Sequence, residues 1–161
     1  MKKTSKPPVL LVLTTTKSGI RSESEAIREA LDRKAPLCAL FVLDPALATP
    51  ASQKLLSAVM GPAAARPLGK ELLKDYENRA RVRFEEIKAD CEEIGVEFES
   101  RVCRGPFVDE VRSYVQSREP SVVILPKRPK SFLSRIFMRD ELAIIKSTAP
   151  HTLIRIIEEE I

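Results

Sequence analysis

The chain contains 161 residues, of which 43% are hydrophobic and 31% are charged, and its net charge at pH 7 is +4. No segment approaches the ~20 consecutive apolar residues of a membrane-spanning helix, so we expect a soluble protein. This length suits one domain with one core. Because 23 acidic residues offset most of the 27 basic ones, the composition does not indicate a specific nucleic-acid partner.

The amino-terminal residues and the cysteines indicate where the protein works. We expect residues 1–8 to form a flexible tail and residues 9–161 to form the domain, because the basic start lacks the long apolar run and cleavage site of a signal peptide. Cys38, Cys91 and Cys103 form no CxxC pair, and their odd number argues against a disulfide framework. They are predicted to be packing residues rather than reactive thiols, in a reducing cytoplasm.

A strand, a helix and a second strand are predicted first. Residues 9–13, VLLVL, form a continuous apolar run, which is typical of a strand covered on both faces. The next helix is predicted to begin at Ser22, which has capping-box spacing with Glu25. A second buried strand is predicted within residues 36–45, PLCALFVLDP. The apolar face predicted for the helix consists of Ile27, Ala30 and Leu31.

A connection and a long helix follow. Residues 45–69 are rich in proline and glycine and are predicted to form a long mobile connection. From Lys70 apolar residues recur every three or four positions, which predicts a helix that Gly95 ends. The residues of this predicted apolar stripe are Leu73, Tyr76, Ala80, Phe84, Ile87, Cys91 and Ile94.

The rest of the chain repeats the alternation of strand and helix. Residues 96–103 alternate between apolar and polar, which predicts a half-exposed edge strand. A short helix is predicted within 105–119, a buried strand at 121–125, a final helix within 139–150 and a last strand at 151–157. The whole pattern predicts an α/β fold, with helices on both faces of a doubly wound, five-stranded parallel sheet.

In such sheets, ligands bind beyond the carboxyl ends of the strands where the strand order reverses. Two segments are expected there, with the hydroxyls of Thr14, Thr15 and Thr16 on the first. These threonines could bind an anion, or they could simply end the strand and cap the helix. The second segment supplies cations that could bind phosphate or form a solvated surface: Lys127, Arg128, Lys130 and Arg139.

Apolar residues lie between these cations, within 132–138. We expect them to pack on the sheet. The less favoured alternatives are an amphipathic patch for a partner protein or, less expected still, a membrane surface.

The chain resembles the universal stress protein family over nearly its whole length. The segments that carry the resemblance are VLLVLTT, ALFVLDP, VEFESRVCRGPFVDEV, SVVILP and STAPHTLIRI. The resemblance implies a Rossmann-like domain, similar to the adenine nucleotide alpha hydrolases, with strand order 3-2-1-4-5. It also implies a homodimer that pairs through the fifth strand, and the interface residues would be Leu153, Ile154, Arg155, Ile156 and Ile157.

The family's ATP-binding motif is altered at every position. Members that bind ATP carry G-x2-G-x9-G-[ST] after the fourth strand, and these positions correspond here to Pro126, Pro129, Arg139 and Asp140. Proline removes backbone donors that phosphate would need. The acidic residue that contacts the nucleotide in ATP binders falls near Thr14. We therefore expect no ATP in the family's usual mode and no other cofactor, although the basic loop could still bind a nucleotide or another anion.

Little in the sequence indicates catalysis. The one histidine, His151, is predicted to open the last strand, where a structural role is the common one. No catalytic triad, metal-spaced cluster or nucleophile elbow occurs. We expect a non-catalytic, dimeric stress-response or regulatory protein, whose protein partner the sequence does not identify.

Overall fold

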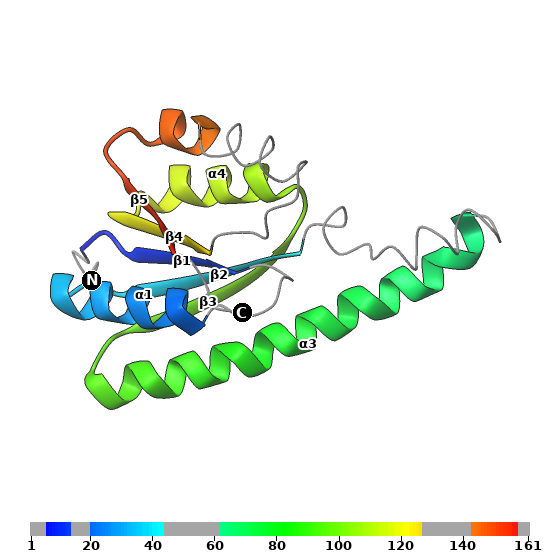
Figure 1. The fold of residues 1–161 in the computed structure, drawn as a ribbon, viewed down its shortest axis with the longest axis horizontal. Helices are drawn as coiled ribbons and strands as arrows, with labels where there is room; N and C mark the ends of the chain where they lie inside the picture. Colours follow the sequence, from blue (N-terminus) through cyan, green and yellow to red (C-terminus); the bar gives the residue numbers. More distant parts are fainter. Residues whose placement is uncertain (1–5, 14–19, 44–61, 127–142, 158–161) are drawn as a thin grey trace, which may run out of the picture.

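The computed structural model describes residues 6–13, 20–43, 62–126 and 143–157. Its strands form one five-stranded sheet in the order β3-β2-β1-β4-β5, and all four pairings are parallel. The predicted fold class and the strand order implied by the family resemblance are confirmed (Figure 1). The strands are β1 (Val9–Leu13), β2 (Leu37–Leu43), β3 (Phe98–Arg104), β4 (Val122–Pro126) and β5 (Leu153–Ile157).

Helices cover both faces of the sheet. α1 (Ile20–Arg33) and α3 (Pro62–Ile94) lie on one face, and α4 (Phe107–Arg118) and a short helix at 143–148 lie on the other (Figure 1). Alternate residues of each central strand enter a different core, because successive side chains point to opposite faces. None of the described helices is long and apolar enough to cross a membrane.

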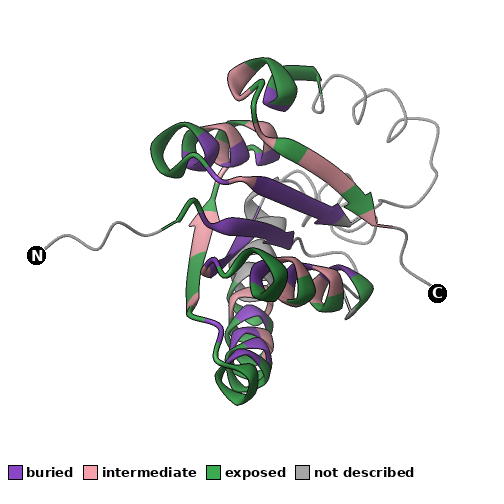
Figure 2. Cartoon of the chain, turned by 90° about the vertical axis from the view of Figure 1, so that its left-hand side faces the viewer, coloured by how far each residue is buried: buried purple, intermediate pink, exposed green. Residues whose placement is uncertain are grey.

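The three central strands are buried and the two outer strands are not (Figure 2). Every residue of β1 and β2 is buried, as expected for apolar strands covered on both faces. β3 and β5 are half exposed, and the predicted edge position of β3 is confirmed. His151 lies in an exposed turn and β5 begins at Leu153, so the prediction that His151 opens the strand is wrong.

α1 begins earlier than predicted. Because the helix starts at Ile20, Ser22 lies inside it, fully buried, and the predicted capping box is wrong. Ala26 and Ala30 enter the core, whereas Leu31 is 46% exposed. Successive residues of a helix lie about 100° apart around its axis. Because the face with Ser22, Ala26 and Ala30 packs on the sheet, the neighbouring Leu31 points to solvent.

α3 also begins earlier, at Pro62, so the prediction of a connection through residue 69 is wrong for its last eight positions. Proline suits the first turn of a helix, where its missing N–H has no intrahelical acceptor. Residues 45–61 of the predicted connection lie outside the described residues. The predicted end at Gly95 is confirmed: its φ is +79°, and the Val96 amide donates to the Cys91 carbonyl at 2.9 Å.

Most of the described apolar stripe of α3 packs on the sheet as predicted. The amino-terminal half of this helix extends beyond the sheet (Figure 1). Tyr76 is partly buried, and Ile94 is 43% exposed, so its predicted burial is wrong. The fully buried members of the stripe are Ala80, Phe84, Ile87 and Cys91.

Candidate functional site

The strand order reverses between β1 and β4, and this is the expected position of a ligand crevice. The last paired residues of these strands are Leu11 and Ile124, and each strand continues for two more residues, to Leu13 and to Pro126. Adjacent strands lie about 4.8 Å apart. The two predicted anion-binding segments therefore leave the sheet from neighbouring strands.

The predicted anion-binding side chains themselves lie outside the described residues, so their roles remain predictions. Of the four altered motif positions, the structure describes only the backbone of Pro126, which ends β4 beside Ile157 of β5. The residues outside the description are Thr14, Thr15, Thr16, Lys127, Arg128, Lys130 and Arg139.

The outer strand β5 carries the predicted dimer residues. Leu153 is 50% exposed and Ile156 is 41% exposed. Ile154 packs against the core beneath α4, and Ile157 packs against the core beneath α1 and α3. Two of the four predicted apolar interface residues are therefore available on the surface, and they point to opposite faces of the sheet.

The fifth predicted interface residue, Arg155, forms ion pairs within its own chain. Its Nη1 lies 2.8 Å from Glu29 Oε2 and its Nη2 lies 3.4 Å from Glu25 Oε2. Glu29 also accepts a hydrogen bond from Arg33 Nε at 2.7 Å. This bond and the nearby charge of Arg155 lower the pKa of Glu29. Arg155 thus holds β5 against α1, a role that the sequence analysis missed, although Glu25 and Glu29 have the i, i+4 spacing of one helix face.

A second polar cluster connects β2, β3 and α4, and no sequence motif indicated it. Cys38 Sγ donates a hydrogen bond to Glu99 Oε2 at 3.0 Å, and Arg118 Nη2 lies 2.8 Å from the same oxygen. The hydrogen bond from Arg118 lowers the pKa of Glu99. Burial, together with a hydrogen bond to Cys38, raises the pKa of Tyr114. The Arg118 guanidinium lies 5.8 Å from the Tyr114 ring centroid, within the range of a cation–π contact.

The cysteines pack as predicted. Cys38 and Cys91 are buried and Cys103 is partly buried. Burial raises the pKa of each thiol from 9.0 to about 11.

We expect these thiols to react about a hundredfold more slowly in the folded protein than in unfolded protein at pH 8, because a pKa higher by two units lowers the thiolate fraction by that factor. Release of thionitrobenzoate from Ellman's reagent, with and without urea, measures both rates. Fast modification of one thiol equivalent in the folded protein would contradict the burial.

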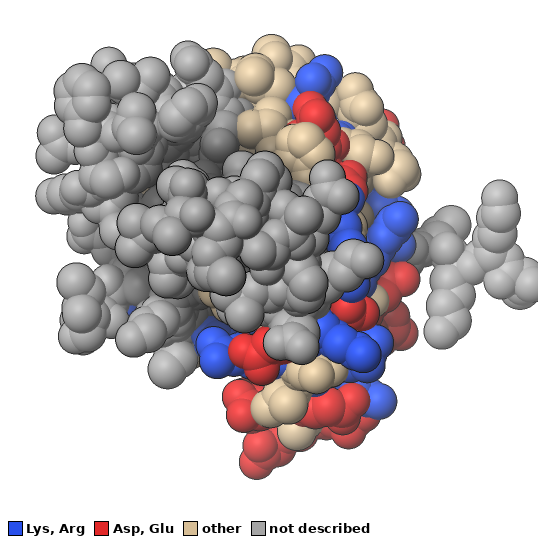
Figure 3. Space-filling view, turned by 90° about the vertical axis from the view of Figure 1, so that its right-hand side faces the viewer, with Lys and Arg blue, Asp and Glu red and all other residues tan. Residues whose placement is uncertain are grey.

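Charged side chains are mixed on the described surface. Figure 3 shows basic and acidic residues interspersed on the described part of one face. Several are paired: Arg104 Nη2 lies 2.7 Å from Glu77 Oε2, and Arg83 pairs with Glu23 between α3 and α1. No cluster of three metal-binding side chains occurs in the parts of the chain that the structure describes.

The chain matches the family model described as universal stress protein family over residues 8–142. The chain belongs to this family. The match includes β1 to β4 and ends before β5. No curated protein sequence is significantly similar to this universal stress protein.

Solved structures with a similar fold include universal stress protein UspA from Lactobacillus plantarum. It shares 16% identity and a TM-score of 0.68, over 96% of this chain and 99% of that one. A family protein from Burkholderia pseudomallei shares 12% identity and a TM-score of 0.63, over 97% and 98%. A universal stress protein in complex with cAMP shares 13% identity and a TM-score of 0.55, over 98% and 100%. At these identities the likeness shows the fold alone, and it includes β5.

Proposed function

We propose that this universal stress protein is a non-catalytic regulatory domain that acts as a homodimer joined through β5 and does not hold ATP in the family's usual way. The exposed outer side of β5 carries the proposal. Within the described part of the chain, β5 pairs with β4 alone, so its other backbone groups have no strand partner. An exposed strand edge of this kind is a template for pairing with a second chain.

The side chains of β5 support a second copy as the partner. Leu153 and Ile156 leave apolar surface on both faces of the edge. A second β5 placed alongside would cover both faces at once, and the same surface would serve both subunits of a twofold dimer. The three cysteines are free, which fits the reducing cytoplasm in which we place this dimer.

We expect light scattering after size-exclusion chromatography to give a mass twice the 18.0 kDa of one chain at micromolar concentration. Ile156→Glu should shift this mass toward that of the monomer, because it places a charge in the apolar contact. Val82→Glu is the control, since Val82 is 61% exposed on α3, away from β5. A monomeric wild-type chain, or a dimer that Ile156→Glu leaves intact, would refute the β5 interface.

A nucleotide- or anion-binding switch is the second candidate function. At the switch point, β1 and β4 each end two residues beyond their last paired residues, and a structural neighbour is described as a universal stress protein in complex with cAMP. In this function, Lys127, Arg128 and Lys130 would replace the missing backbone donors with charged side chains.

Thermal unfolding with and without millimolar ATP and magnesium separates the two candidates. A ligand at 100 times its Kd stabilises a protein by about 2.7 kcal/mol. We expect no rise in Tm if the first proposal holds. A rise that alanine substitution of Lys127, Arg128 and Lys130 abolishes would establish the switch instead.

A further inference from the structure

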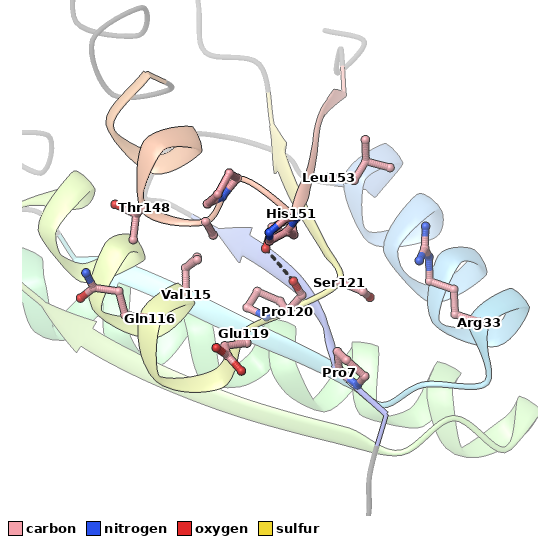
Figure 4. Close-up of a pocket in the computed structure, with 13 residues that line it drawn as sticks. Pro7, Arg33, Val115, Gln116, Glu119, Pro120, Ser121, Thr148, His151 and Leu153 are labelled. Carbon is pink, nitrogen blue, oxygen red and sulfur yellow. Dashed lines mark hydrogen bonds between the residues drawn. The ribbon is translucent and has the colours of Figure 1, made fainter.

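A cavity of about 750 Å³ opens at the amino-terminal end of the strands, opposite the switch point (Figure 4). Its wall runs from the end of α4, across the residues that precede β4 and β5, to the end of α1. Its volume is within the range of ordinary small-molecule sites, about 300–1,000 Å³.

Charges of opposite sign lie at its two ends. Glu119 follows α4 and Arg33 ends α1, and they lie on opposite sides of Pro120 and Ser121 (Figure 4). Glu119 is exposed, and its carboxylate has no partner among the described residues. Arg33 uses its Nε for Glu29, at 2.7 Å. Within the described chain, the two Nη groups of Arg33 remain available to a ligand.

The backbone of the wall offers few donors. Pro7, Pro120 and Pro150 have no N–H. A phosphate cradle requires a row of free amides, and this wall lacks one in its described residues. The carbonyls that end α4 add partial negative charge beside Glu119. Several backbone amides of the wall lie outside the helices and already donate hydrogen bonds within the chain. They are the amides of Glu119, Ser121, Ala149, Thr152 and Leu153.

The middle of the cavity combines apolar and polar groups, among them the Ser121 hydroxyl, which is buried and has no hydrogen-bond partner among the described residues. Val115, Ala149 and the three prolines present small apolar surfaces between the charged ends. The hydroxyl of Thr152 is engaged, since it donates to the Pro120 carbonyl at 2.9 Å (Figure 4). A ligand that complements this wall has a slender body with both apolar and hydrogen-bonding groups, and a charge at each end.

We propose that this cavity binds an elongated zwitterion of short-peptide size, with its ammonium group at Glu119 and its carboxylate at Arg33. The guanidinium fork of Arg33 suits a carboxylate, and the Glu119 carboxylate accepts hydrogen bonds from an ammonium group. This site is separate from the nucleotide crevice. It shares Leu153 with the proposed β5 interface, but it does not require the dimer.

Titration of the ¹⁵N-labelled full chain with trialanine, followed by NMR, tests the site. We expect saturable shifts of the Gln116, Glu119 and His151 amides. N-acetyl-trialanine and trialanine amide each lack one terminal charge, and each should bind about two- to fivefold more weakly. No saturable shift, or equal affinity for the capped peptides, would overturn the proposal.

Two variants assign the ends of the ligand. The Glu119→Gln variant should bind trialanine and N-acetyl-trialanine with equal affinity but should still prefer trialanine to trialanine amide. The Arg33→Gln variant should bind trialanine and trialanine amide with equal affinity but should still prefer trialanine to N-acetyl-trialanine. Lys34→Gln is the control, because Lys34 is exposed next to Arg33 and does not line the cavity. A variant that changes both preferences equally would contradict the assigned orientation. Binding of 6-aminohexanoate would support recognition through the separated charges alone. Its failure beside trialanine would show that the length or the amide groups of the peptide contribute to binding.

Discussion

Ile87→Ala is expected to lower the free energy of unfolding by about 2–5 kcal/mol, because it empties a fully buried site. Ile87 is 1% exposed on α3 and belongs to the core beneath α1 and α3. One turn earlier, Phe84 packs edge-on against Phe41 of β2, with ring centroids 6.4 Å apart. The cavity left by alanine would lie between α3 and the sheet, which the contact between Phe84 and Phe41 holds in place. Urea unfolding followed by circular dichroism measures the loss.

Val82→Ala provides the matched control on the same helix. Val82 is 61% exposed, and alanine has the higher helix propensity, so the change should stay within about 0.5 kcal/mol of zero. Both substitutions remove methyl groups from aliphatic side chains of α3. Equal effects at both positions would show that α3 does not pack on the sheet through the face described.

The sequence was sufficient for those parts of the fold in which local pattern and tertiary packing agree. In β1 and β2 a continuous apolar run coincides with burial on both faces. At the carboxyl end of α3, Gly95 occupies the left-handed conformation that its stop signal predicted. In α1, the local pattern and the tertiary packing disagree. Ser22 resembles a helix cap, but it lies inside the helix and is fully buried. Packing on the sheet buries the helix face that carries Ser22 and leaves Leu31 exposed.

The polar clusters could not be predicted, because they join residues far apart in the chain. Cys38 meets Arg118 across 80 positions, and Arg155 meets Glu29 across 126. Each of these residues reads as an ordinary strand or helix residue in its own segment. The cavity between Glu119 and Arg33 is likewise formed where the ends of separate elements converge. Only the topology brings these groups together.

Tyr114→Ala, in the core beneath α4, is the second substitution with a large expected effect. It should lower the free energy of unfolding by about 3–5 kcal/mol. Tyr114 is 5% exposed on α4 and packs with residues of β1, β2 and β4. Its hydroxyl and its ring have separate roles, since the hydroxyl meets Cys38 and the ring lies beneath Arg118. The substitution removes the packing, the hydrogen bond and the cation–π contact together, and urea unfolding measures their sum.

Tyr114→Phe separates these contributions, because it removes the hydroxyl and keeps the ring. We expect a loss of about 0.5–1.5 kcal/mol, the usual contribution of one hydrogen bond. Most of the destabilisation by alanine should therefore come from the ring, which fills the space between α4 and the sheet. Losses of equal size for phenylalanine and alanine would mean that the ring contributes little and that the polar cluster with Cys38 holds α4 on the sheet. The ratio of the two losses thus decides whether α4 is attached mainly through its apolar face or through the cluster that Glu99 and Arg118 complete.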